Sequence, residues 1–138
     1  MGQEYFKWSN VYETGFARID TQHKVILKIL NELYEVVLIN KQDEKLTDIL
    51  HELVQYTIYH FDEEEKLFSK YGYIEIEEHK RAHEDFVRKI TDFKNRLDKN
   101  TRLLTVELID FLKDWLIDHI LVEDQKYAEY FKKKGIQI

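Results

Sequence analysis

The chain has 138 residues, of which 43% are hydrophobic, 35% charged and 14% aromatic. This length predicts one domain, residues 1–138, and the aromatic content excludes a disordered chain. The absence of cysteine excludes disulfides, thiolate metal sites and thiol catalysis, and the absence of proline argues against a many-stranded β fold. A net charge of -6 without a basic stripe argues against nucleic-acid binding. Because signal-peptide features and long apolar runs are lacking, we expect a cytoplasmic protein with no membrane partner.

The first segment, residues 1–18, is dense in aromatic side chains that follow no clear period. Its aromatic residues are Tyr5, Phe6, Trp8, Tyr12 and Phe16. A disordered tail rarely carries so many large apolar side chains. We therefore expect an ordered arm that lies against the rest of the protein, although termini are often frayed.

Residues 19–134 carry apolar side chains at the i, i+3, i+4, i+7 spacing of helices with one buried face. Four helices are predicted, at about Asp20–Asn40, Asp43–Tyr71, Glu75–Lys99 and Arg102–Lys134. Asp20 or Thr21 can cap the first helix, and Gly72 and Gly135 are expected to end the second and fourth, which leaves residues 135–138 as a short tail. Amphipathic helices joined by short links predict an all-α, antiparallel up-down four-helix bundle with an N-terminal aromatic-rich arm.

Polar residues interrupt these apolar faces, and every predicted helix contributes at least one. A spacing of four places His60 with Glu64 and His79 with His83 on common faces. A single histidine on an apolar face is more often a hydrogen-bonded core residue than a metal ligand. Together, however, the buried groups would leave several polar atoms unsatisfied without a metal. The predicted metal ligands are His23, His60, Glu64, His79, His83, His119 and Asp124.

The same register separates other polar residues from this set. His51 lies nine residues before His60, about half a turn out of register on the helix, and is predicted to be a surface residue. Within the acidic run 62–65, only Glu64 lies on the line of His60. Its neighbours are expected to be solvated charges, and Glu63 is the fallback ligand.

The weakest geometric prediction concerns Asp124. It follows His119 by five residues, roughly 140° around an ideal α-helix, so spacing alone leaves its role undecided. Seven donors exceed the needs of one ion and suit two ions with shared carboxylates. Mixed nitrogen and oxygen ligands without thiolates fit iron, manganese, nickel or zinc, and we favour iron.

The motifs form an ordered set that spans essentially the whole chain. In chain order they are Trp8, Asp20-x-Gln22-His23, His60-Phe61-x-x-Glu64, His79-x-x-x-His83 and Trp115-x-x-x-His119-x-x-x-x-Asp124. This set resembles the hemerythrins, most closely the single-domain bacterial members, with no departure at a ligand position. The resemblance supports Asp124, because the family uses the same five-residue spacing.

The resemblance implies a non-haem centre of two iron ions, bridged by carboxylates and by an oxo or hydroxo group. One iron would take His79, His83 and His119, the other would take His23 and His60, and the shared bridges would be Glu64 and Asp124. The second iron then keeps an open position for dioxygen. Residues that flank His119 are expected to shield this ligand pocket, unless they are plain core packing: Trp115, Ile120 and Leu121.

The implied function is reversible dioxygen binding for oxygen storage, transport or sensing by a monomeric protein that is not an enzyme. A di-iron oxidase or peroxidase, or a nitric-oxide-handling enzyme, remains the alternative. A histidine-rich set that leaves one vacancy favours binding over oxidation. A sensor would also need a separate, unidentified protein partner.

Overall fold

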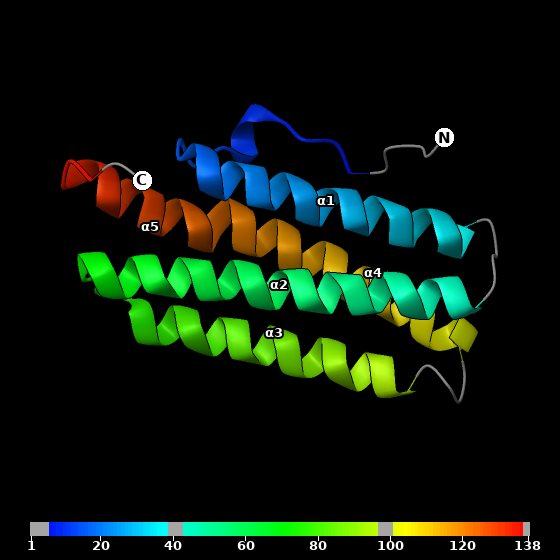
Figure 1. The fold of residues 1–138 in the computed structure, drawn as a ribbon. Coiled ribbons are helices and arrows are strands. Elements are labelled where there is room, and N and C mark those ends of the chain that lie inside the picture. The colour runs from blue at the N-terminus through cyan, green and yellow to red at the C-terminus, as the bar shows by residue number, and fades with distance from the viewer. Residues whose placement is uncertain (1–5, 39–42, 97–100, 137–138) are drawn as a thin grey trace.

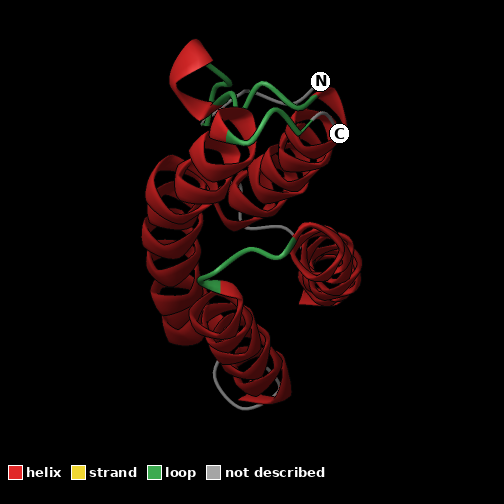
Figure 2. Ribbon diagram, turned by 90° about the vertical axis from the view of Figure 1, so that its left-hand side faces the viewer, coloured by secondary structure: helices red, strands yellow, loops and turns green. Residues whose placement is uncertain are grey.

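The computed structural model describes residues 6–38, 43–96 and 101–136. These residues form helices and loops, with no strand among them (Figure 2). The helices are η1 (Asn10–Tyr12), α1 (Ala17–Leu38), α2 (Asp43–Tyr71), α3 (Ile76–Arg96), α4 (Thr101–Asp118), η2 (His119–Glu123) and α5 (Asp124–Lys133). In Figure 1 the long helices lie side by side, and α1 packs on α2, α2 on α3, α3 on α4 and α4 on α1. The predicted helical bundle is confirmed, with α4, η2 and α5 following one another as its fourth member.

Apart from the start of the first helix, the helix ends agree closely with the sequence prediction where they are described. Helix α2 has the predicted bounds, Asp43–Tyr71. Gly72 and Gly135 follow α2 and α5 with φ angles of 66° and 72°, in the left-handed region that glycine enters without a Cβ clash. Outside the described part of the chain lie the predicted helix ends Asn40 and Lys99, residues 1–5 of the arm and residues 137–138 of the tail.

The start of the first helix differs from the prediction. Helix α1 begins at Ala17, so Asp20 lies inside its first turn and is not its cap. The Asp20 carboxylate instead accepts hydrogen bonds from the Thr14 N–H and hydroxyl, both at 2.8 Å, and from the Gly15 N–H at 3.3 Å. The difference arises because the carboxylate binds amides upstream of the helix, and it thereby fixes the end of the arm.

The arm is ordered over residues 6–16, as predicted, and runs beside α1 (Figure 1). The Asn31 side chain accepts from the Phe6 N–H at 2.8 Å and donates to the Phe6 carbonyl at 3.0 Å. Near the other end of the arm, the Gln125 amide donates to the Glu13 carbonyl at 3.1 Å. The arm is thus hydrogen-bonded to both α1 and α5.

The buried apolar side chains form two clusters with a polar layer between them. On α1, His23 lies between Ile19 of the smaller cluster and Ile26 of the larger one. The larger cluster includes Leu30, Leu50, Phe86, Ile90 and Leu112, and the smaller one includes Phe16, Phe68, Tyr127 and Phe131. Along the bundle, the polar layer therefore lies between two clusters of packed apolar side chains. None of the helices in the described ranges has the length and apolar character needed to cross a membrane.

Candidate metal centre

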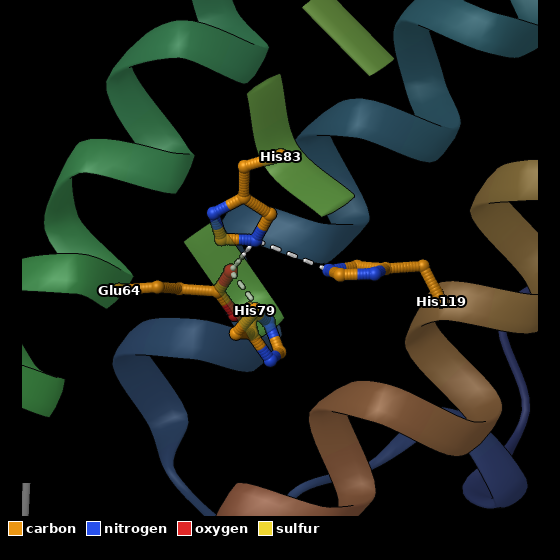
Figure 3. Close-up of side chains that lie close together, drawn as sticks. All are labelled: Glu64, His79, His83 and His119. Atoms are coloured by element: carbon orange, nitrogen blue, oxygen red, sulfur yellow. Dashed lines mark hydrogen bonds and ion pairs between the residues drawn. The ribbon is translucent and has the colours of Figure 1, made fainter. Parts of the chain in front are cut away.

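The seven predicted ligand residues come together in the polar layer of the bundle. All are buried, and the most exposed of them, His119, has only 4% of its surface accessible. Their donor atoms form two groups, in each of which all atoms lie within 4.8 Å of one another. Figure 3 shows one group, contributed by α2, α3 and η2: Glu64, His79, His83 and His119. The other group is His23, His60, Glu64 and Asp124.

The two oxygens of Asp124 face different histidines. Its Oδ1 atom lies 3.0 Å from His119 Nε2 and 3.2 Å from His79 Nε2. Its Oδ2 atom lies 2.8 Å from His23 Nε2. This carboxylate is therefore positioned between the two groups, as a shared ligand would be.

Glu64 occupies the complementary position on α2. Its Oε1 atom lies 3.2 Å from His83 Nε2, 3.5 Å from His60 Nε2 and 3.9 Å from His79 Nε2. Its Oε2 atom accepts a hydrogen bond of 2.7 Å from the Tyr127 hydroxyl. All five histidines thus present Nε2 to a carboxylate oxygen in the middle of the bundle.

A π-helical turn accounts for the presence of Asp124 in this cluster. The Asp124 N–H donates to the His119 carbonyl, an i→i+5 bond that closes the wider turn of η2. This turn brings two residues five positions apart to one side of the helix. The helix predicted from the sequence has 3.6 residues per turn along its whole length. Spacing alone therefore left the role of Asp124 undecided.

The electrostatics of the cluster are dominated by burial and by mutual attraction. Burial lowers the pKa of His60 to about 4. Burial also opposes charge on His83, but the adjacent carboxylates of Glu64 and Glu65 outweigh it and raise the His83 pKa to about 9. Burial and the nearby Asp124 carboxylate oppose ionisation of Glu64, yet the adjacent histidines lower its pKa to about 2. The cluster therefore keeps carboxylate charge in an apolar interior, where protonated histidines or bound cations are needed to balance it.

Several polar atoms of the cluster have no hydrogen-bond partner. They are His23 Nδ1 and Nε2, His60 Nε2, Glu64 Oε1, His79 Nε2 and both carboxylate oxygens of Asp124. The Nε2 atoms of His83 and His119 lie 3.2 Å apart, a separation that allows only one of them to carry the proton between them. Buried polar groups are normally satisfied, and this donor set suits first-row metal ions. The residues therefore fit a metal centre.

Three residues outside the predicted set hold these ligands in place. Gln22 Oε1 lies 2.6 Å from His60 Nδ1, Glu65 Oε2 lies 2.9 Å from His83 Nδ1, and Tyr127 donates to Glu64. The prediction that Glu65 is a solvated charge is wrong, because helix α3 brings His83 against it. No signal within the α2 sequence could reveal a partner that comes from another helix.

Two other residues that the register separates from the ligands lie outside the cluster. His51 is exposed, as predicted, and its Nδ1 lies 2.8 Å from the Lys94 ammonium. Glu63, the fallback ligand, forms an ion pair with Arg18, and its side chain is only 14% exposed, so the prediction that it is a solvated charge is also wrong. The α-helical period therefore placed both residues outside the cluster but did not reveal the partner of Glu63 on α1.

Aromatic rings enclose the three-histidine group. The Trp115 ring stacks on His119 with centroids 4.3 Å apart and an interplanar angle of 16°. The Phe61 ring stacks on His83 at 3.8 Å and 3°. The pocket role of Trp115 stays a prediction, and the side chains of Ile120 and Leu121 lie outside the described part of the chain.

Comparisons with known proteins agree with this arrangement. The family model for the hemerythrin HHE cation binding domain matches residues 14–131, which include all seven predicted ligands. Bacteriohemerythrin of Clostridium acetobutylicum is 33% identical over 129 residues, which cover 90% of this chain and 99% of that protein. Myohemerythrin of Theromyzon tessulatum is 27% identical and covers 90% of this chain and 92% of that protein.

A solved structure extends the likeness to the backbone. The crystal structure of a wild-type hemerythrin superposes with a TM-score of 0.78 at 25% identity, covering 91% of this chain and 96% of the other. Fold, metal-ligand geometry and sequence similarity point to one family of metal-binding helical bundles. The chain belongs to the hemerythrin family.

Proposed function

We propose that the buried cluster holds two iron ions and that the protein binds dioxygen reversibly there. The observation that carries this proposal is the convergence of five histidine Nε2 atoms on two carboxylates that have unsatisfied oxygens. The names bacteriohemerythrin and myohemerythrin of the relatives support the same reading. When bound, a pair of irons supplies the electrons with which dioxygen is held and released.

The ligand assignment follows the two groups of donor atoms. We assign His79, His83 and His119 to one ion and His23 with His60 to the other. Glu64 and Asp124 are assigned as shared ligands, because each carboxylate has close contacts with histidines of both groups. The position beside His23 and His60 has fewer protein donors, which leaves room for a small molecule.

Reversibility depends on excluding water from this position. The cluster lies between two apolar layers, and Phe68 packs its ring edge to face with His79, with centroids 4.7 Å apart. A dry site limits the proton supply that drives irreversible oxidation. This enclosure favours a dioxygen carrier, for storage, delivery or sensing, over the alternative of a di-iron oxidase, a peroxidase or an enzyme that handles nitric oxide.

The experiment that tests the proposal measures dioxygen uptake by the reduced, iron-loaded full chain in a closed oxygen-electrode cell. We expect uptake to stop at one dioxygen for each pair of irons and to be recovered when oxygen is removed. The metal-free protein is the control and is expected to take up none. Continuing consumption after that point would overturn the carrier and support the enzyme.

A further inference from the structure

Two of the five clustered histidines have a described hydrogen-bond partner on Nδ1, the ring nitrogen that faces away from the cluster. One of these partners is charged and the other is neutral. His83 Nδ1 contacts the carboxylate of Glu65, whereas His60 Nδ1 contacts the neutral amide oxygen of Gln22. Since both partners can only accept through these oxygens, each imidazole donates from Nδ1, which leaves Nε2 as the atom that would offer its lone pair to a metal ion. Both Nε2 atoms point at Glu64, which confirms that the rings are oriented toward the cluster.

The two contacts differ in their surroundings as well as in charge. Gln22 is buried, with 5% of its surface accessible, whereas the Glu65 side chain is 27% exposed at a groove between α2 and α3. This groove has a volume of about 450 Å³ and is also lined by Phe61, Glu84 and Arg88. In the described ranges, the ion pairs of Glu65 are limited to His83, and Arg88 is paired with Asp85. The charge of Glu65 is therefore directed at His83.

The ring of His83 is also fixed from its face. Phe61 stacks on one face of the ring with an interplanar angle of 3°. The Glu65 contact fixes the same ring within its own plane. A carboxylate that accepts from Nδ1–H makes the imidazole a stronger donor at Nε2 than a neutral acceptor does. The protein therefore builds one histidine of the three-histidine group to be more electron-rich than its counterpart His60.

We propose that Glu65 is a positioning residue that, through His83, makes the three-histidine position the tighter of the two metal positions. Gln22 orients His60 at the other position without strengthening it by charge. This inference rests on the proposed two-metal function and adds an order of binding to it. Loss of such outer partners typically weakens metal binding by roughly 10–100-fold.

The test is a titration of the metal-free full chain with Co²⁺, whose visible bands report the ligands of each bound ion. We expect two Co²⁺ to bind, the first more tightly. Glu65→Gln keeps the acceptor oxygen and removes the charge, and it should weaken the first Co²⁺ by about tenfold while leaving the second unchanged. Circular dichroism of each variant checks that the helices are intact.

Two further variants separate a specific contact from a general charge effect. Glu84→Gln removes a negative charge from the same groove without a histidine contact, and both Co²⁺ affinities should stay at their wild-type values. Gln22→Glu places a carboxylate against His60 and should tighten the second Co²⁺. In the double variant Gln22→Glu with Glu65→Gln, the first Co²⁺ should bind more weakly and the second more tightly, so the difference between the two affinities should be smaller than in wild type.

The outcomes distinguish this inference from the proposed function. If wild-type protein binds fewer than two Co²⁺, the two-metal function fails and this inference fails with it. If wild-type protein binds two but Glu65→Gln behaves like Glu84→Gln, the function stands and the role of Glu65 is overturned. A difference between the two Co²⁺ affinities in the double variant that is as large as in wild type would also overturn that role.

Discussion

His119 Nε2 lies 3.0 Å from Asp124 Oδ1, although an offset of five positions would turn the two side chains apart on an α-helix. The π-helical turn His119–Glu123 closes this gap, and its carbonyl-to-amide bond joins the same two residues. Such turns are rare and are frequently found at functional sites. Here the turn brings a second carboxylate, that of Asp124, beside the histidines of the cluster.

Asp124→Ala removes the oxygens that face His23, His79 and His119. We expect metal binding to weaken by more than about tenfold, since even partners outside the ligand shell are worth that much. Metal content after loading and desalting measures it. Asp118→Ala is the matched control, because Asp118 precedes His119 but is exposed, and its metal content should equal that of wild type.

A buried histidine of the cluster and an exposed histidine outside it together test the ligand assignment. His83→Ala removes a nitrogen that lies 3.2 Å from Glu64 Oε1, and we expect iron content to fall well below two per chain. His51→Ala removes an exposed side chain that contacts Lys94, and iron content should not change. Full iron occupancy in His83→Ala would contradict the assignment, and loss of iron in His51→Ala would contradict the placement of the site.

Tyr127→Phe tests how the Glu64 carboxylate is held. The variant leaves Glu64 Oε2 without its buried donor, so we expect the metal-free protein to lose about 1–3 kcal/mol of stability. Tyr130→Phe removes a hydroxyl that donates to the carbonyl of exposed Gly72 and should cost less than about 0.5 kcal/mol. Urea unfolding followed by helical circular dichroism compares the two, and equal losses would argue against the Glu64 contact.

Opposite pKa shifts predict a maximum in the stability of the metal-free protein. Burial lowers the His60 pKa from 6.5 to about 4, so the unfolded chain binds more protons between these values and stability falls as the pH drops. Although burial opposes it, contact with Glu64 and Glu65 raises the His83 pKa from 6.5 to about 9, so its contribution is lost as the pH rises through that range. We expect the free energy of unfolding to peak near pH 6.5, and a steady rise from pH 6.5 to 9 would contradict this.

Much of the fold could be predicted because each helix carries its own signal. The apolar period gave the bounds of α2, and Gly72 and Gly135 marked two helix ends. The inward position of the five histidines followed from the same period. These features depend on the spacing of residues within one helix, which can be read directly from the sequence.

Other features depend on packing between helices or on departures from the ideal helix. The position of Asp124 needed the π-helical turn, and the role of Glu65 needed α3 to bring His83 beside it. Asp20 or Thr21 was expected to cap α1, but both lie inside the helix, and Asp20 binds the Thr14 and Gly15 amides at the end of the arm. In each case the deciding partner lies on another element or in a different helical geometry.

The most direct test of the central claim is the visible absorption spectrum of the reduced, iron-loaded full chain before oxygen, after oxygen and after its removal, with iron counted on the same sample. We predict two irons per chain and an absorption band that appears with oxygen, leaves with it and returns over repeated cycles. A chain that holds fewer than two irons, or a band that decays to a permanent ferric spectrum while oxygen is consumed, would contradict reversible dioxygen binding.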